Sequence, residues 1–171
     1  MRARVGHRGV TIVEFLGASM IATIIGGSII LLMNGMRQAY QAHTTFRQLS
    51  GYLDVAATTL RNDIWAATNA TKTGDGSCVA NDWLRLEKSG GSAAIWPIRY
   101  CLDKGDLSNI KLQRQLNDGT SWVVAQNIVE ASTTATVTIP EIKLDLWVSR
   151  TVNGRAYPRQ IRDLRYYLQV P

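Results

Sequence analysis

The chain has 171 residues, which is enough for one modest domain and an additional segment but not for two large hydrophobic cores. It carries 19 Lys and Arg against 13 Asp and Glu, a formal net charge of +6. Three of the positive charges, Arg2, Arg4 and Arg8, precede a long apolar run near the N-terminus. The chain after Arg8 has 16 basic and 13 acidic residues, a net charge of +3. So small an excess argues against a dedicated nucleic-acid-binding protein.

The first predicted element is a membrane-spanning helix over residues 10–36. From Phe15 to Met33 the chain has 19 residues without a charge, and between Val10 and Met36 only Glu14 is charged. A helix over this range would be about 40 Å long, which exceeds the roughly 30 Å hydrocarbon core of a bilayer. The run is also longer than the apolar part of a signal peptide. Because basic residues that flank a span stay in the cytoplasm, the three N-terminal arginines predict that the rest of the chain is exported.

Glu14 lies within this apolar run, where an acidic side chain costs about 2.5 to 3.5 kcal/mol. Residues four apart lie on one helix face, so Glu14 shares a row with small residues, and a second small-residue row lies beside it. Such rows allow helices to approach closely in lipid, which predicts a helix-packing surface. The alternative is that Gly and Ala are simply frequent in membrane helices. The two rows are Val10, Glu14, Ala18, Ala22 and Gly26, and Ser19, Thr23 and Gly27.

The segment Arg8-Gly9-Val10-Thr11-Ile12-Val13-Glu14-Phe15-Leu16 resembles the N-terminus of type IV prepilins and type II secretion pseudopilins. In that family a short basic leader ends in Gly, and the mature chain carries Glu as its fifth residue. The resemblance implies that residues 1–9 are a leader peptide, that a prepilin peptidase cuts between Gly9 and Val10, and that Val10 is then N-methylated. It also implies that Glu14 serves peptidase recognition and assembly, by pairing with the new ammonium group of its own chain or of a neighbouring subunit. The chain departs from the family pattern in having Val10 in place of Phe or Met, and in having no proline before Pro97.

An amphipathic continuation of the helix is predicted over residues 37–70. Apolar residues recur there at steps of three and four, which is typical of a helix with one buried face. Gly51 costs up to about 1 kcal/mol within a helix and would allow a bend. The helix is expected to end near Asn69 to Gly76, where Asn, Thr, Gly, Asp and Ser cluster. The repeating residues are Phe46, Leu49, Leu53, Ala56, Leu60, Ile64 and Ala67.

A β-rich exported head is predicted over residues 77–171, because apolar and polar residues alternate there. Asn117-Asp118-Gly119 and Asn153-Gly154 are typical of hairpin turns, and Pro97 predicts a strand at a sheet edge or a bulge. A long helix that covers one face of a mainly antiparallel sheet is an α+β architecture. It is also the pilin-like architecture that the N-terminal resemblance implies. The predicted strands lie at residues 84–87, 96–102, 107–116, 122–130, 142–148 and 164–170.

Cys78 and Cys101 both fall in the exported part, where an oxidising compartment favours a disulfide. Closing a loop of this length would contribute about 3 kcal/mol in the chain-entropy model. The alternative is a pair of buried thiols. A metal site that includes these cysteines is not expected, because His7 and His43 lie far from them in the sequence.

Enzymatic activity is not expected, because the chain lacks the Gly-x-Ser-x-Gly, His-Glu-x-x-His and phosphate-loop motifs. Asp103 and Asp106 lack the spacing of an EF-hand calcium loop, so no cofactor or metal is predicted and calcium binding is left open.

DNA contact is a competing function, because arginines and tyrosines interleave near the C-terminus in a pattern that suits phosphate contact and base stacking. The solvent-facing position expected for Arg165 beside a buried Tyr166, together with the charge of Asp163, favours an ordinary strand instead. The residues concerned are Arg150, Arg155, Arg159, Arg162 and Arg165, with Tyr157, Tyr166 and Tyr167.

Three further segments are similar to J-type minor pseudopilins and W-type minor pilins: Leu60-Arg61-Asn62-Asp63-Ile64, Ile98-Arg99-Tyr100 and Leu112-Gln113-Arg114-Gln115. The resemblances imply a minor pilin or pseudopilin of the bacterial inner membrane, with one span and a periplasmic head, that enters or primes the tip of a type IV pilus or secretion pseudopilus. The implied partners are other subunits through the N-terminal helix, the prepilin peptidase and the inner-membrane assembly platform. The alternatives are a DNA-contacting minor pilin of a competence pilus and a single-pass periplasmic protein unrelated to filaments.

Overall fold

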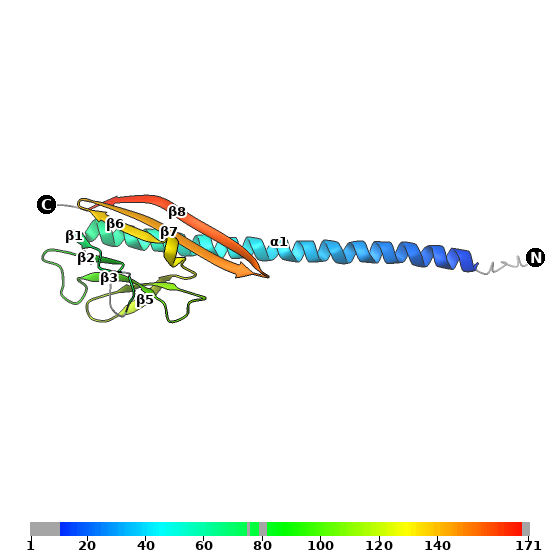
Figure 1. Ribbon diagram of the computed structural model, residues 1–171, viewed down its shortest axis with the longest axis horizontal. Helices are drawn as coiled ribbons and strands as arrows, with labels where there is room; N and C mark the ends of the chain where they lie inside the picture. The colour runs from blue at the N-terminus through cyan, green and yellow to red at the C-terminus, as the bar shows by residue number, and fades with distance from the viewer. Residues whose placement is uncertain (1–10, 75, 79–81, 169–171) are drawn as a thin grey trace, which may run out of the picture. The chain divides into compact units, whose positions relative to one another are not determined.

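The N-terminal element of the computed structural model is the helix α1 (Ile12–Ala66) (Figure 1). The structure describes residues 11–74, 76–78 and 82–168. Internal contacts divide the chain into two units, residues 1–41 and 42–171, so that α1 contributes to both. Within the described residues, α1 is the helix whose length and composition allow it to cross a membrane, as expected from the apolar run.

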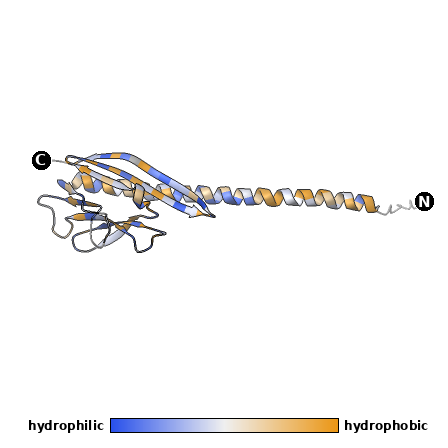
Figure 2. Ribbon diagram, in the orientation of Figure 1, coloured by the Kyte–Doolittle hydropathy of each residue, from blue (hydrophilic) through white to orange (hydrophobic). Residues whose placement is uncertain are grey.

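In the first unit, the surface of α1 is apolar and uncovered. Every described residue from Thr11 to Tyr40 is exposed except Gly26, which is half-buried. Large apolar side chains are among them, with Ile12 79% and Leu31 74% exposed. Figure 2 shows the apolar character of this part of α1. A helix that is apolar on all sides is stable when lipid or other protein surrounds it.

In the second unit, α1 buries one stripe of its surface, as the periodicity predicted, and it continues through Gly51. It ends at Ala66, before the predicted end at residue 70. The chain leaves the helix because the Thr68 amide donates to the Glu87 carbonyl at 2.8 Å and the following residues pair with a strand. The buried helix residues are Thr45, Leu49, Leu53, Ala56, Leu60 and Ile64.

The remaining described elements form two antiparallel sheets, so that the predicted α+β architecture is confirmed with two sheets in place of one. The first sheet has the order β1-β2-β3-β4-β5 and the second the order β6-β7-β8. A short 3-10 helix, η1 (Glu130–Ser132), lies between them in the chain. The strands are β1 (Asn69–Thr71), β2 (Leu84–Glu87), β3 (Ile98–Asp103), β4 (Lys111–Gln115), β5 (Ser121–Ala125), β6 (Thr134–Thr138), β7 (Glu141–Val152) and β8 (Arg155–Tyr167).

Several strand predictions need correction. β1 and β6 were not predicted. The strands expected at residues 107–116 and 122–130 are shorter, since β4 covers 111–115 and β5 covers 121–125, and β8 begins at Arg155 and not at Leu164. Pro97 precedes β3, which is the central strand of the first sheet, so its expected place at an edge was wrong. β3 begins one residue later, at Ile98, and a proline just before a strand removes no hydrogen bond from the ladder.

Both predicted turns connect neighbouring strands. Asn117-Asp118-Gly119 lies between β4 and β5, and Gly119 has a φ of 89°. Asn153 and Gly154 connect β7 to β8 with φ values of 51° and 74°. Two successive left-handed residues give the turn that matches the right-handed twist of a hairpin, which explains why Asn-Gly is found there.

One hydrophobic cluster joins the buried stripe of α1 to alternate residues of both sheets. In β7 the buried positions alternate strictly from Ile142 to Val148, as predicted. The second sheet is also tied to the helix by a hydrogen bond in which the Tyr166 hydroxyl donates to the Ala57 carbonyl at 3.2 Å. The helix stripe therefore anchors the two sheets of the second unit in a common core.

Candidate functional site

The described N-terminus of α1 forms a capping box. The Thr11 amide donates to Oε2 of Glu14 at 2.9 Å, and the Glu14 amide donates to the Thr11 hydroxyl at 3.2 Å. The Thr11 hydroxyl also donates to the same carboxylate oxygen at 3.0 Å. Thr11-Ile12-Val13-Glu14 is the sequence signature of this motif, although it was not recognised in the sequence.

The capping box changes the interpretation of Glu14. The carboxylate satisfies a helix-terminal amide and lies at the positive end of the helix dipole, so it has a partner within its own chain. Local capping is therefore a second explanation for an acid at this position. Gly9 and Val10, the expected cleavage and N-methylation positions, lie outside the described residues, and their roles stay predictions.

The predicted helix-packing rows are exposed in the structure. The Ser19 hydroxyl donates to the Leu16 carbonyl at 2.9 Å, and the Thr23 hydroxyl donates to the Ser19 carbonyl at 2.8 Å, so both are satisfied inside the helix. A Cβ atom added at Gly26 or Gly27 would meet no atom within 4 Å. Glycine in a helix interior costs about 1 kcal/mol, and no contact within the described chain offsets this cost. Ala18 and Ala22 of the same rows are also exposed.

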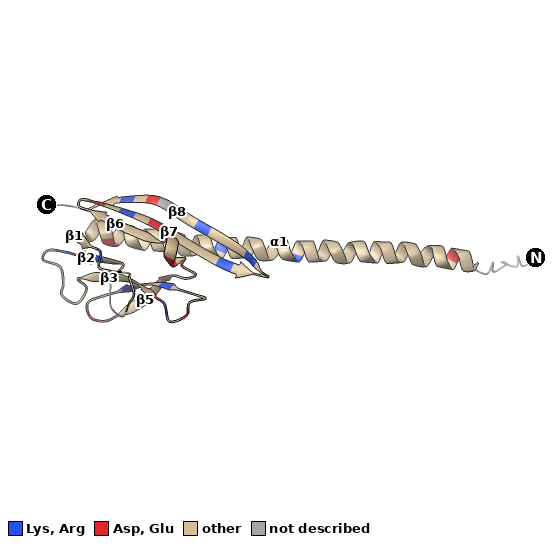
Figure 3. Ribbon diagram, viewed as in Figure 1, with Lys and Arg blue, Asp and Glu red and all other residues tan. Residues whose placement is uncertain are grey.

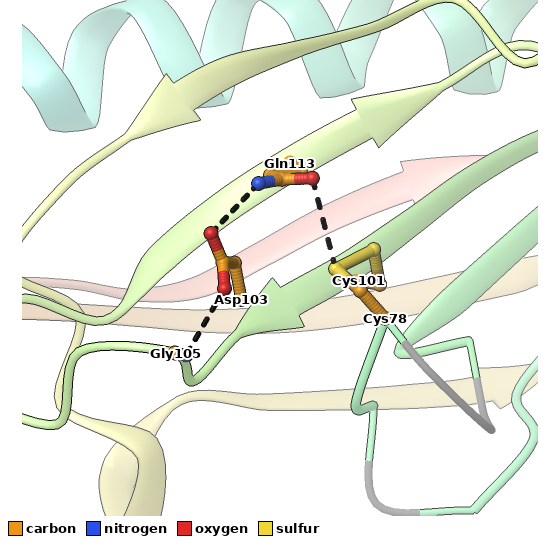
Figure 4. Close-up of a disulfide and its surroundings, with 5 residues drawn as sticks. All are labelled: Cys78, Cys101, Asp103, Gly105 and Gln113. Atoms are coloured by element: carbon orange, nitrogen blue, oxygen red, sulfur yellow. Dashed lines mark hydrogen bonds between the residues drawn. A yellow bond between two sulfur atoms is a disulfide. The ribbon is translucent and has the colours of Figure 1, made fainter.

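Cys78 and Cys101 form the predicted disulfide, with their Cα atoms 4.8 Å apart (Figure 4). Cys101 is buried in β3, whereas Cys78 is exposed in the segment that precedes β2. The same segment is held by the Leu102 amide, which donates to the Gly76 carbonyl at 2.6 Å. The disulfide thus ties the segment after β1 to the centre of the first sheet.

Gln113, opposite Cys101 on β4, lies against the disulfide. Its Oε1 atom is 3.9 Å from Sγ of Cys78, a contact without a shared proton because disulfide sulfur carries no hydrogen. Its amide nitrogen donates to Oδ2 of Asp103 at 2.9 Å, and the Gly105 amide donates to Oδ1 at 3.0 Å (Figure 4). The Asp103 carboxylate therefore already has a donor on each oxygen.

A buried polar cluster connects α1 to the first sheet. Asp63 of α1 accepts hydrogen bonds from the Tyr100 hydroxyl of β3 and from the Arg114 guanidinium of β4. The second guanidinium bond joins Nη2 of Arg114 to Oδ1 of Asp63 at 2.8 Å. Tyr100 and Arg114 are opposite each other in the sheet, and the Arg114 guanidinium lies 4.5 Å from the centre of the Trp122 ring on β5. The Asp63 and Arg114 side chains are only 13% and 11% exposed.

The electrostatics of this cluster fit a structural clamp. Burial raises the pKa of Tyr100 far above its ordinary value, and the Asp63 carboxylate adds to the effect. Burial acts to lower the pKa of Arg114, but the hydrogen bonds and charge of Asp63 outweigh it and raise the pKa. Asp63 and Arg114 thus form a bidentate ion pair, with Tyr100 as an additional neutral donor. The sequence pointed to these residues only through the J-type resemblance and not as a cluster.

Metal-binding geometry is not found in the described residues, among which no three or more His, Cys, Asp and Glu side chains come together. Asp106 accepts from the amide and the hydroxyl of Ser108 at 2.9 and 2.6 Å, and these bonds lower its pKa. Asp106 therefore acts as an acceptor within its own loop, and Asp103 accepts from this loop and from β4.

The C-terminal arginines are divided between the two ends of the β7–β8 hairpin and do not form one continuous patch along β8. Arg150, Arg155 and Arg159 lie toward the turn between β7 and β8, whereas Arg165 forms an ion pair with Glu141 at 3.5 Å near the other end. Arg155 and Arg165 are ten residues apart, which is about 34 Å along a strand. The side chain of Arg162 lies outside what the structure describes.

The tyrosines interleaved with these arginines are mostly engaged in packing. Tyr166 is 8% exposed, and the Tyr157 ring lies edge-on to Phe46 of α1 with the ring centres 5.6 Å apart. Tyr167 is 57% exposed. A continuous base-stacking surface is thus not formed by the described residues of β8.

Comparison of the chain with models of protein families, with curated proteins and with solved structures finds no match.

Proposed function

We propose that this chain is a minor pilin or pseudopilin subunit, which a prepilin peptidase processes and which then joins, or primes the tip of, a type IV pilus or a type II secretion pseudopilus. The proposal begins with the resemblance of Arg8 to Leu16 to the prepilin N-terminus. The proposal places the first unit's part of α1 in the inner membrane and the second unit in the periplasm before assembly.

The observation that carries this proposal is the uncovered, glycine-containing half of α1. Four glycines of the first unit, Gly17, Gly26, Gly27 and Gly35, have no atom within 4 Å of an added Cβ. Nothing in the described chain requires a small residue at these positions, so the requirement would come from a neighbouring helix. A plain membrane anchor would function with Leu or Ala in their place.

The second unit suits the role of a head that is exported and then carried on a helix. Its disulfide fits an oxidising compartment. Its clamp of Asp63, Tyr100 and Arg114 fixes the continuation of α1 to the first sheet, so a force applied through the helix would act on the whole head. A subunit that is pulled from a membrane by its helix needs such a connection.

Processing is tested by mass spectrometry of the N-terminus after co-expression with a prepilin peptidase. For wild type we expect a chain that begins at N-methylated Val10. For the Gly9→Val variant we expect a chain that begins at Met1 or otherwise retains the leader. A wild-type chain that retains its leader, or one that is cut after the apolar run, would contradict the proposal.

Assembly is tested separately by Gly26→Leu, with Met20→Leu as a matched control on the same uncovered helix. We expect both variants to insert and to be processed, and only Gly26→Leu to reduce cross-linking to other subunits. Equal cross-linking by the two variants would favour the alternative of a membrane-anchored protein unrelated to filaments.

A further inference from the structure

Two segments of the chain contain arginines but no acidic residues. One comprises the apolar run and the part of α1 that follows it, and the other surrounds the β7–β8 turn. No acidic residue occurs from Phe15 to Leu53, although Arg37 and Arg47 fall in this range. No acidic residue occurs from Leu146 to Arg162 either, a range that also holds Arg150, Arg155 and Arg159. Figure 3 shows basic positions of the β7–β8 hairpin toward its turn, and the acidic positions of the hairpin toward its other end.

Contacts within the second unit bring Arg150 and Arg159 against α1, on either side of Arg47 in its sequence. Arg150 donates to the side-chain carbonyl of Gln48 on α1 at 2.9 Å. The Arg159 guanidinium lies over the Phe46 ring, 4.6 Å from its centre, and the Tyr157 ring packs against the same phenyl group. The turn end of the hairpin is therefore held against α1 at Phe46 to Gln48.

A groove of about 590 Å³ lies at this junction. Arg47 and Arg159 line it, and its one acidic residue, Asp54, lies seven residues beyond Arg47, about 10 Å farther along the helix. Among the residues that the structure describes, the exposed side chains of Arg47 and Arg155 have no hydrogen-bonding or ionic partner. We name Arg47, Arg150, Arg155 and Arg159 the basic collar.

Only a short length of chain separates the apolar run from the helix residues that the collar contacts. Ten residues separate Met36 from Phe46, which is about 15 Å along a helix such as α1. The headgroup region of a bilayer adds about 5 to 8 Å on each side of the hydrocarbon core. The remaining distance of about 10 Å is comparable to the Debye length and to the reach of an extended arginine.

We propose that the basic collar binds the anionic headgroups of the phospholipid leaflet from which α1 emerges, so that the head is held on the membrane until the subunit is extracted. Clustered basic residues beside a membrane helix attract anionic lipid, with each arginine contributing about fivefold in binding. The proposal rests on the membrane anchorage that the proposed function also requires, but not on filament assembly.

DNA is the other polyanion that such a surface could bind, and the structure favours lipid. Tyr157 packs edge-on against Phe46, and the Arg159 guanidinium lies over the Phe46 ring, so both of these aromatic rings are already engaged in packing. The collar also lies at the turn end of the hairpin and does not continue along β8, because Arg165 is paired with Glu141. A short basic surface next to a membrane span suits a plane of headgroups better than an extended strand of nucleic acid.

The test uses the full chain in nanodiscs of phosphatidylcholine, either alone or with about one-third phosphatidylglycerol, and measures backbone hydrogen exchange at residues 151–156. We expect slower exchange in the anionic discs, and loss of this protection in high salt. Arg47→Gln with Arg155→Gln should reduce the protection about 25-fold, at fivefold per arginine. Lys72→Gln with Lys111→Gln removes the same charge elsewhere on the head and should leave the protection unchanged.

Equal exchange in neutral and anionic discs would overturn the proposal, as would an equal loss of protection in the two double variants. Protection by added duplex DNA in neutral discs, without protection by anionic lipid, would identify a nucleic-acid surface instead. A chain that does not enter the discs at all would contradict both this proposal and the proposed function, whereas a chain that enters without lipid-dependent protection contradicts only this one. Unchanged exchange elsewhere in the head shows that each variant is folded.

Discussion

Replacing Arg114 by Met tests whether the buried cluster clamps α1 to the first sheet. In the native structure the Asp63 side chain is 13% exposed. Without Arg114, the Tyr100 hydroxyl is the remaining partner of this carboxylate in the cluster. Removing one member of a buried ion pair costs about 3 to 5 kcal/mol, and the residual exposure of both side chains favours the lower end, about 3 kcal/mol. For a unit of this size, such a loss lowers the midpoint of thermal unfolding by about 10 °C.

Asp63→Asn should cost less, about 1.5 kcal/mol, because an amide oxygen in place of Oδ2 still accepts from Tyr100 and from Nε of Arg114, whereas the charge and the bond from Nη2 are lost. In the Arg114→Met background the same substitution should cost almost nothing, since it removes a charge that no longer has a counterion. The double-mutant cycle should therefore show a coupling free energy of about 1.5 kcal/mol.

The assay is urea and thermal unfolding of the full chain in detergent micelles, followed by near-ultraviolet circular dichroism. Arg61→Met is the matched control, because Arg61 is an exposed residue on the same helix that lies over the Trp65 ring at 5.2 Å. It should cost less than about 1 kcal/mol. The reasoning is refuted if Arg114→Met costs no more than Arg61→Met, or if the effects at Asp63 and Arg114 are additive.

Three further predictions concern pH, the disulfide and the helix cap. Because the pKa of Tyr100 is raised in the folded state, its contribution is present below pH 10 and is lost as pH rises toward the folded pKa. In unfolding titrations above pH 10, the fall in stability should therefore be about 1.4 kcal/mol per pH unit smaller in Tyr100→Phe than in wild type, while the fall due to Tyr166 remains in both. Cys78→Ser with Cys101→Ser should lower the unfolding free energy by about 3 kcal/mol, and an unchanged urea midpoint would contradict this. Thr11→Val should lower the helical protection of the first turn by about 1 kcal/mol in hydrogen exchange, whereas equal exchange would show that Thr11 does not cap α1.

The helix could be predicted from the sequence because both of its patterns are local. An uncharged apolar run indicates a span, and steps of three and four indicate a buried stripe. Its end could not be predicted, because Ala67 continues the apolar pattern and is itself buried. The helix stops at Ala66 through a long-range event, the hydrogen bond from the Thr68 amide to the Glu87 carbonyl.

The strands, like the helix, could be predicted only where the sequence pattern is local. β7 has strict alternation of large apolar residues and was predicted, whereas β1 and β6 are short and contain mainly Ala and Thr. Alternation also does not reveal which strands pair, so the division into two sheets could not be inferred. The members of the buried cluster are separated in the sequence by 37 residues for Asp63 to Tyr100 and by 51 for Asp63 to Arg114, and no local pattern connects them.

The two halves of α1 differ in how much of their surface is buried, and this difference bears on the role of Glu14. The second half buries Leu, Ile and Ala side chains against the head and has one glycine, Gly51, which is exposed. The first half places its glycines on a surface that contacts nothing in the described chain. Glu14 lies at the start of that surface and accepts hydrogen bonds from Thr11 in the isolated chain. If a neighbouring ammonium group replaces the Thr11 hydroxyl as its partner during assembly, the capping box is the resting state of the residue, and the cap and the subunit contact are successive roles of the same carboxylate.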